Sequence, residues 1–270
     1  MPHTTETGTL LLADLKTMDG GGVGCDIIGY HSRERSIAMS TTTLLPSSVR
    51  TERVPPLENG DYLTRQEFER RYEAMAHLKK AELLRGVVYM PSPLRLDQHG
   101  HPHFELVGWA FLYEAATSGI VGADNSTIRL GPEDEPQPDV LLMIPRELGG
   151  QAAIDADGFV DGAPELAIEV AASSVSYDLH VKLEVYQERG VREYVVWRTQ
   201  DRAIDWFVLR GGVYERLEPR PDGILRSEVF PGLWLEPSAL TNGDRARLIN
   251  VLQQGIASPE HTSFVESLRR

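Results

Sequence analysis

The chain has 270 residues, of which 41% are hydrophobic and 25% charged, and its formal net charge is −13. These are the proportions of an ordinary globular protein with one main domain. The acidic balance argues against a chain that coats nucleic acid nonspecifically, because such binding depends on Lys and Arg that neutralise phosphates. The single cysteine, Cys25, excludes an internal disulfide and a cysteine-based zinc framework. No apolar run approaches the ~20 residues of a membrane span and the first 30 residues lack a signal-peptide pattern, so we expect a cytoplasmic protein with no membrane segment.

Residues 1–58 differ in composition from the rest of the chain. Stretches such as MDGGGVG, MSTTTLLPSSVR and VPPLENG are rich in Thr, Ser, Gly and Pro without a sustained period, which indicates a disordered N-terminal arm. The glycine run at 20–24 lacks the Gly-Lys-Ser/Thr ending of a phosphate loop and does not favour a nucleotide site. Met39 is an alternative start that would remove most of the arm; the intact mass of protein expressed from its native start would test this hypothesis.

The domain predicted over 59–236 begins with a helix and a hairpin. Thr64 and Glu67 have the spacing of a capping box, and the apolar residues that follow keep helical spacing, which predicts a helix over 65–79. AELL and VVYM, separated by two residues, predict a tight hairpin. The segment PHFELVGWAFLYEAATSG predicts a second helix that ends at Gly119.

Strands dominate the following part of the chain. STIRL, DVLLMIP and APELAIEVAA predict strands, DADG predicts a turn, and YDLHVKLEVYQER predicts a helix that ends at Gly190. VREYVVWR, AIDWFVLR, GVYERL and LRSEVFPGLWL predict strands that complete the sheet, and residues 237–270 predict a helical C-terminal extension. This order favours a mixed α/β fold (α+β, with a mixed sheet, flanking helices and β-hairpins) over a doubly wound parallel sheet.

Two carboxylates mark the strands where we expect chemistry. Asp139 begins one strand, and Glu169 lies in the next long one, ELAIEVA, where alternation places it on one face with Glu165 and Ala167. A buried ionised glutamate is costly unless it is paired or bound to a cation. If the two strands are neighbours, both carboxylates converge on one hard cation, and Mg²⁺ or Mn²⁺ suits such oxygen ligands.

The helix after this strand supplies a cation. Asp178, Lys182 and Tyr186 are spaced four residues apart and therefore share a helix face. A lysine facing a metal site could orient or activate a water and balance charge while a phosphodiester is attacked. Spacing alone also allows an exposed ion pair between Asp178 and Lys182. Ser173 and Ser174 are expected to cap this helix, because no nucleophile elbow surrounds them.

Five segments carry a family resemblance: AELLRGVVYMPSP, QPDVLLM, PELAIEVAASS, YDLHVKLEVY and GVREYVVWR. In their order and approximate spacing, residues 60–235 resemble the Uma2 family, endonucleases of the PD-(D/E)XK nuclease superfamily. The resemblance implies a restriction-endonuclease-like core, in which a mixed sheet is flanked by helices. It also implies a metal-dependent phosphodiesterase site at the strand ends.

The resemblance also implies roles for individual residues. Asp139 matches the motif aspartate, Glu169 the motif glutamate, and Glu82 an early acidic residue that lies near the metal. The general superfamily pattern has a lysine two positions after the glutamate, where this chain has Ala171. The Uma2 pattern moves the lysine onto the following helix, which makes Lys182 the candidate.

The histidines of HGHPH leave three interpretations open, of which the plainest is a loop and the start of the second helix. His99, His101 and His103 stand at alternate positions, which on a strand would direct all three at one zinc or iron ion, although the intervening Gly and Pro disfavour a strand. In the family pattern a histidine commonly falls where the second helix begins, so His99 or His103 could contact phosphate or a metal-bound water. Gln137 and Asp178 are further auxiliary candidates.

We therefore expect a Mg²⁺- or Mn²⁺-dependent endonuclease that acts on nucleic acid, with DNA as the favoured substrate. Asp139, Glu169 and Glu82 would be the metal ligands, and Lys182 would join them as the fourth catalytic residue. The alternatives are a noncatalytic interaction protein that retains the fold and a zinc or iron enzyme built on the histidines. Glu82 could also be a surface residue of the hairpin, and Asp139 a residue of a turn or strand edge. Apolar strands and the segment DWFVLRGGVYERL could supply a homodimer surface.

Overall fold

The computed structural model describes residues 53–91 and 93–269. Predictions made for the chain before residue 53, which include most of the disordered arm, the glycine run at 20–24, Cys25 and the Met39 start, lie outside the described residues. Leu57 is buried against Phe68 and its neighbours, so packed structure already begins before the boundary expected at residue 59.

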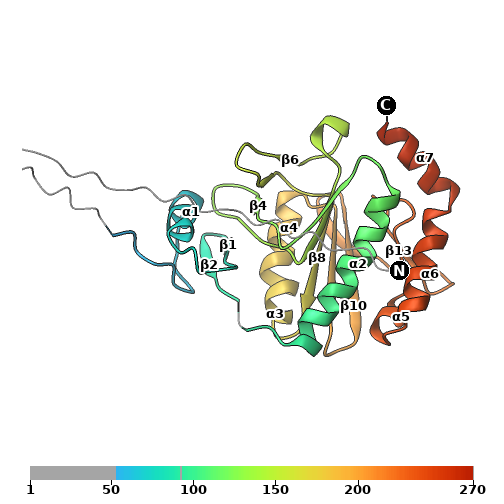
Figure 1. Cartoon of the computed structure of the whole chain (residues 1–270), viewed down its shortest axis with the longest axis horizontal. Helices are drawn as coiled ribbons and strands as arrows, with labels where there is room; N and C mark the ends of the chain where they lie inside the picture. Colours follow the sequence, from blue (N-terminus) through green and yellow to red (C-terminus); the bar gives the residue numbers. More distant parts are fainter. Residues whose placement is uncertain (1–52, 92, 270) are drawn as a thin grey trace, which may run out of the picture. The chain divides into compact units, whose positions relative to one another are not determined.

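The described chain alternates helices and strands (Figure 1). Its helical elements are α1 (Arg65–Glu73), the π-helical turn η1 (Leu96–Gly100), α2 (His101–Ala116), the 3-10 turn η2 (Arg146–Leu148), α3 (Val175–Tyr177), the π-helical turn η3 (Asp178–Lys182), α4 (Leu183–Arg189), α5 (Pro237–Thr241), α6 (Arg245–Ile256) and α7 (Pro259–Leu268). Its strands are β1 (Glu82–Leu84), β2 (Val87–Tyr89), β3 (Val121–Asp124), β4 (Ile128–Arg129), β5 (Val140–Met143), β6 (Ala153–Ile154), β7 (Val160–Asp161), β8 (Leu166–Ala171), β9 (Glu193–Arg198), β10 (Ala203–Arg210), β11 (Val213–Arg216), β12 (Leu225–Arg226) and β13 (Trp234–Leu235).

A six-stranded sheet in the order β11-β10-β9-β8-β5-β3 forms the centre of the fold. β8 and β9 are parallel, and the other neighbouring pairs are antiparallel. The chain passes from β8 to β9 through α3, η3 and α4, because a parallel pair needs a crossover connection. The predicted mixed α/β fold class and the predicted β1–β2 hairpin are confirmed.

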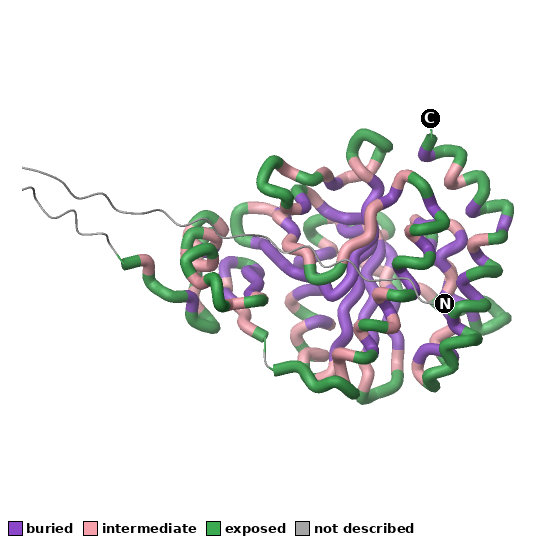
Figure 2. Tube along the Cα trace, in the orientation of Figure 1, coloured by how far each residue is buried: buried purple, intermediate pink, exposed green. Residues whose placement is uncertain are grey.

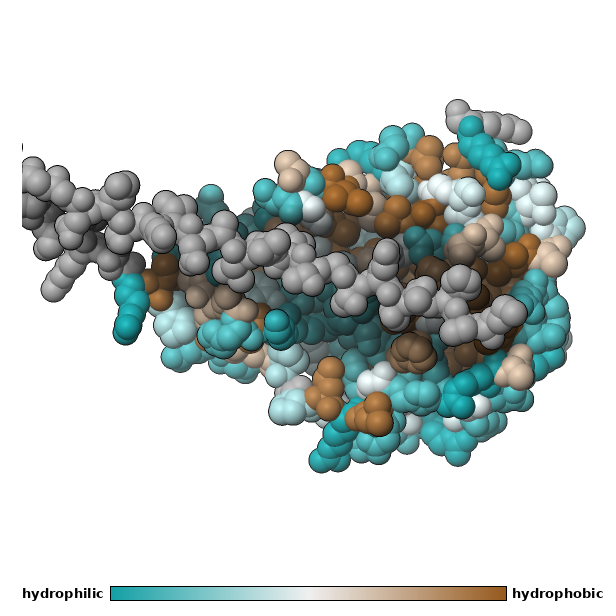
Figure 3. Space-filling model, in the orientation of Figure 1, coloured by the Kyte–Doolittle hydropathy of each residue, from teal (hydrophilic) through white to brown (hydrophobic). Residues whose placement is uncertain are grey.

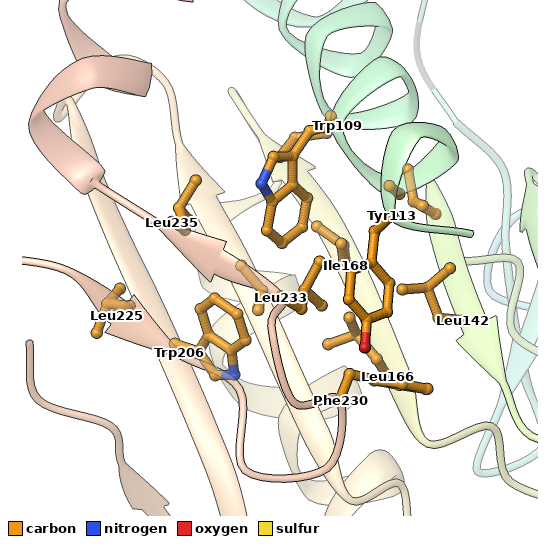
Figure 4. Packing of buried hydrophobic residues seen from close by; sticks show 14 of the residues in the cluster. Trp109, Tyr113, Leu142, Leu166, Ile168, Trp206, Leu225, Phe230, Leu233 and Leu235 are labelled. Atoms are coloured by element: carbon orange, nitrogen blue, oxygen red, sulfur yellow. The ribbon is translucent and has the colours of Figure 1, made fainter. Parts of the chain in front are cut away.

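Helices cover both faces of this sheet (Figure 1). On one face α2 packs with residues of α5, α6 and α7, and α4 packs on the other. Figure 4 shows Trp109, Tyr113 and Trp206 in the cluster on the α2 face. Alternation in β8 sends Leu166, Ile168 and Val170 to the cluster on the α2 face, and Ala167 and Ala171 to the cluster on the α4 face. The predicted alternation is confirmed. Every residue of β8 is buried, and the strands form the buried centre in Figure 2. A side chain on β8 is therefore covered by helices on either face.

Several element boundaries differ from the prediction. Thr64 caps the helix, since its hydroxyl accepts a hydrogen bond from the Glu67 backbone N–H. The box itself is not closed, because the Glu67 carboxylate accepts from Arg70 and Arg71. The helix α1 ends at Glu73 instead of residue 79. Turns follow it, and they still pack Met75 and Leu78 onto the small cluster around Phe68. The helical spacing there reflected shared burial and not a continuous helix.

The sheet also differs from the prediction in two places. The short strand β3, with Gly122 in its centre, was not predicted. LRSEVFPGLWL does not complete the central sheet, because β12 and β13 pair with each other in a separate two-stranded sheet. No helix in the described part of the chain is long and apolar enough to cross a membrane. The surface seen in Figure 3 is largely hydrophilic, with separate apolar patches.

Candidate active site

Asp139 and Glu169 lie opposite each other on neighbouring strands. β5 and β8 are antiparallel with Val140 opposite Ile168, so Asp139, one residue before β5, lies across from Glu169. Residues directly opposite in an antiparallel pair have their Cβ atoms about 5 Å apart on the same face. Both side chains are buried, at 2% and 3% exposure. The expectation that the two strands are neighbours is confirmed.

Asp139 is surrounded by hydrogen-bond donors. Its Oδ2 accepts hydrogen bonds from the Val170 backbone N–H (2.8 Å) and from Nε2 of His99 (3.1 Å), and its Oδ1 lies 3.2 Å from Nζ of Lys80. Its backbone carbonyl accepts from Nε2 of His103 at 2.9 Å. Burial opposes ionisation of Asp139, but the His99 hydrogen bond and the Lys80 charge outweigh it and hold the pKa below its usual range. Asp139 is therefore a carboxylate at neutral pH.

Lys182 lies among three other carboxylates. Its Nζ is 2.7 Å from Oε1 of Glu169, 2.9 Å from Oε1 of Glu82 and 4.0 Å from Oδ1 of Asp178. The Tyr186 hydroxyl donates to the same oxygen of Glu169 at 3.3 Å. Lys182, Asp178 and Glu82 are buried. The exposed ion pair that spacing alone allowed and the surface position considered for Glu82 are therefore wrong.

One ammonium cannot offset all the carboxylates around it. Burial opposes the charge on Lys182, but Glu169 and Glu82 outweigh burial and raise its pKa, so the ammonium stays charged. Burial raises the pKa of Glu169 well above its usual value; Lys182 opposes this rise, and Asp139 adds to it. Burial likewise raises the pKa of Asp178. An additional positive charge beside these carboxylates would therefore be favourable.

The donor set fits a hard divalent cation. Four buried carboxylates form an acid cluster: Glu82, Asp139, Glu169 and Asp178. Their cations are Lys80 and Lys182, so the cluster has two more carboxylates than cations. In the described chain, the hydrogen bonds and ion pairs of the Glu82 and Glu169 carboxylates all use Oε1. No group of three or more His, Cys, Asp or Glu among the described residues is arranged to hold an ion. Mg²⁺ needs only one or two carboxylates, completed by waters and substrate phosphate, and the facing pair provides these.

Two buried polar atoms near the cluster have no hydrogen-bond partner among the described residues. They are Nδ1 of His99 and the hydroxyl of Tyr177, whose ring lies 5.4 Å from Nζ of Lys182. Burial, together with the charge of Glu82, raises the pKa of Tyr177, so its hydroxyl keeps its proton. Buried polar groups in folded proteins are nearly always hydrogen-bonded. Both atoms could therefore contact a bound ligand or water.

The three histidines do not face one metal. His99 and His103 both contact Asp139, whereas His101 lies 3.2 Å from Glu105 and 2.6 Å from Arg245. This segment is helical, and positions two residues apart on a helix point to different sides. The histidine-based zinc or iron site is wrong for this reason.

The predicted serine cap and the Gln137 side chain also take other partners. Ser174 is the N-cap residue of α3, but its hydroxyl donates to Oδ2 of Asp178 (2.5 Å) and accepts no hydrogen bond from a backbone N–H of the helix. The Gln137 backbone N–H donates to Glu82 at 2.7 Å, whereas its side-chain amide donates to Thr127 at 2.7 Å. Gln137 therefore supports the position of Glu82 through its backbone.

Lys80 is the site residue that sequence reasoning missed. It contacts Asp139 directly and stands two residues before Glu82. Residues two apart in an extended segment point to the same side, so the spacing of Lys80 and Glu82 was a signal that could have placed both beside the metal candidates.

The fold and these contacts define a mixed α/β protein with a carboxylate and lysine site at the ends of two central strands. The family model for Uma2, described as "Putative restriction endonuclease", matches residues 65–238, and the chain belongs to this family. The resemblance to the Uma2 family seen in the sequence is thereby confirmed. No curated protein matches the chain. A solved structure from Anabaena variabilis, a "putative nuclease belonging to DUF820", is 14% identical, covers 67% of this chain and 98% of its own, and has a TM-score of 0.48.

Proposed function

We propose that the chain is a metal-dependent endonuclease that hydrolyses phosphodiester bonds of nucleic acid, with DNA as the favoured substrate. The observation that carries this proposal is the facing pair Asp139 and Glu169, with Lys182 in contact with Glu169. Membership of a family described as "Putative restriction endonuclease" supports nuclease chemistry. The net charge of −13 argues against binding of nucleic acid over the whole surface. Contact with the substrate would therefore occur at a local site.

Asp139 and Glu169 would hold the cation, Mg²⁺ or Mn²⁺, and Glu82 would assist directly or through a water. A divalent cation bound there would neutralise charge on the scissile phosphate and stabilise the leaving oxygen. His99 and the Val170 backbone N–H hold the Asp139 carboxylate in place, which fixes its direction before the substrate arrives. The remaining chemistry falls to the lysine.

Lys182 would position the attacking water. Its neighbours hold its ammonium in the charged state, so it can donate hydrogen bonds but cannot accept a proton. The lysine would therefore orient the water and offset the charge that develops at the phosphate. Glu169 and Glu82 keep the ammonium fixed at 2.7 and 2.9 Å, which limits the reorganisation needed during the reaction.

A cleavage assay with a matched pair of variants tests the proposal. The full chain is incubated with Mg²⁺ or Mn²⁺ and plasmid DNA, linear duplex, single-stranded DNA or RNA. Glu169→Gln and Asp139→Asn are each expected to lower the rate at least about 100-fold, the scale of losing one electrostatic stabiliser. Glu165→Gln is the control, because Glu165 is equally buried on the same face of the chain but bonds the backbone of Ile144 and Gln151.

Circular dichroism would first establish that each variant folds. Unchanged cleavage by folded Asp139→Asn and Glu169→Gln proteins would refute the proposed site. Binding of nucleic acid by the wild type, without cleavage in either metal, would favour the noncatalytic alternative.

A further inference from the structure

Lys80 is a second cation of the site, to which the proposed reaction assigns no role. Its Nζ lies 3.2 Å from Oδ1 of Asp139 and 3.3 Å from Oδ1 of Asn125. Its side chain is 20% exposed, whereas that of Lys182 is 3% exposed. Lys182 is thus enclosed by the carboxylates, and Lys80 lies where the cluster meets solvent. Any phosphate that enters the site would reach Lys80 before Lys182.

The scarcity of lysine in this chain also distinguishes Lys80 and Lys182 from the other basic residues. Lys and Arg together number 27, but only four of them are lysines: Lys16, Lys79, Lys80 and Lys182. Every other ion pair of a Lys or Arg in the described chain is made by arginine, while both cations of the acid cluster are lysines. An arginine side chain forms a planar fork that holds a carboxylate in one geometry, whereas an ammonium is a compact charge on a flexible stem that can change partners.

We propose that Lys80 is a phosphate-binding residue of this site, whose ammonium moves from Asp139 to a non-bridging oxygen of the substrate phosphate when a divalent cation takes its place on that carboxylate. This inference rests on the proposed function. The ammonium and the cation compete for one carboxylate, and an incoming phosphate gives the displaced ammonium a new anion. The carbonyl oxygen of the Asn125 side chain can keep the ammonium at the mouth of the site during the exchange, since it already lies within hydrogen-bond distance.

The salt dependence of DNA binding tests the contact with phosphate. All proteins are full-length and carry Asp139→Asn, which releases the ammonium, and the buffer contains EDTA, which withholds the divalent cation that the proposed cleavage needs. Fluorescence anisotropy with a labelled duplex compares this protein with versions that also carry Lys80→Ala, Lys80→Gln or Lys79→Ala. Lys79 is the matched control, because it is the adjacent residue, is exposed and has no ion pair within the described chain.

Removing Lys80 is expected to reduce the slope of log K against log salt by about 0.9, the value for one phosphate contact on duplex DNA. Lys79→Ala should leave the slope unchanged. Equal slopes with and without Lys80, or an equal loss for Lys79→Ala, would overturn the proposal. The two Lys80 substitutions guard against a folding defect, since glutamine keeps most of the side-chain volume.

Titration of Mg²⁺ alone, followed by calorimetry, gives a second readout. In the Asp139-containing protein, Lys80→Gln is expected to bind Mg²⁺ several-fold more tightly than the wild type, because the competing ammonium is gone. A residue that only held Asp139 in place would have the opposite effect, and weaker Mg²⁺ binding would overturn the proposal. Failure of the proposed function would show separately, as a wild type that cleaves no nucleic acid with Mg²⁺ or Mn²⁺.

Discussion

Replacing Lys182 with methionine tests how far the acid cluster depends on its enclosed ammonium. The substitution keeps most of the side-chain volume but removes a charge 2.7 Å from Glu169 and 2.9 Å from Glu82. Both carboxylates are then buried without this cation, and removal of one partner from a buried ion pair costs about 3–5 kcal/mol. Domains are stable by about 5–15 kcal/mol, so the variant should fold with a large and measurable loss of stability.

Urea unfolding of the full chain in EDTA, followed by tryptophan fluorescence near pH 8 and near pH 5.5, measures this loss. Burial raises the pKa of Glu169 and of Asp178 in the folded protein, and loss of the ammonium raises both further. A group with a raised folded-state pKa contributes stability that is present at low pH and is lost as pH rises through that pKa. The deficit of Lys182→Met should therefore be larger near pH 8 than near pH 5.5.

Lys80→Met is the matched control for this experiment. Its ammonium is one-fifth exposed, and Asp139 keeps the hydrogen bonds from His99 and Val170, so the loss of stability should be smaller. A deficit for Lys182→Met below about 1 kcal/mol near pH 8, the scale of an exposed ion pair, or a deficit independent of pH would refute the reasoning.

Three further predictions concern the metal, one titrating group and one packing contact. Asp139→Asn should abolish Mg²⁺ binding in calorimetry at low ionic strength, whereas binding equal to that of the wild type would place the ion elsewhere. Burial and a neighbouring glutamate raise the pKa of Glu135 from 4.5 to about 8, so its contribution to stability is complete below about pH 4.5 and is lost as pH rises through 8; Glu135→Gln should flatten this part of the stability profile in urea titrations. A Cβ on Gly255 would lie 2.1 Å from the carbonyl oxygen of Gly232, so Gly255→Ala should lose about 3 kcal/mol in thermal unfolding, whereas Gly108→Ala, with open space around it, should lose nothing.

Local periodicity was enough to place Glu169 and Lys182. Alternation along β8 is a property of the strand itself, so it assigned the faces before the neighbouring strands were known. The four-residue spacing of Asp178, Lys182 and Tyr186 likewise held, because the π-helical turn η3 and α4 keep these side chains on the side that meets Glu169. What spacing could not show was their burial, which depends on how the helix packs on the sheet.

Lys80 belongs to the site through a contact between distant parts of the sequence. Its contact with Asp139 joins residues 59 apart in the sequence, and the one local signal in KKAELL is that Lys80, unlike the exposed Lys79, stands two residues before Glu82. The difference arises because the residues before β1 are extended, which directs alternate side chains to opposite sides. The histidines also depend on the local backbone conformation. A strand would have directed all three to one side, whereas the helix brings only His99 and His103 to Asp139.

The stability of a Glu169→Gln variant distinguishes a cation-binding site from an acid cluster that only stabilises the fold. A stabilising ion pair would make Glu169→Gln less stable in every buffer, because Lys182 would lose its nearest partner. In a cation site the carboxylates exceed the lysines, and Glu82 and Asp178 still contact the ammonium after the substitution. Urea unfolding in EDTA near pH 8 should then give Glu169→Gln a stability equal to or above that of the wild type.

Addition of Mg²⁺ should reverse the order, since a ligand at 100 times its Kd stabilises the wild type by about 2.7 kcal/mol and the variant has lost the site. A variant that is less stable in EDTA and gains as much from Mg²⁺ as the wild type would show that Glu169 serves the fold and not the ion.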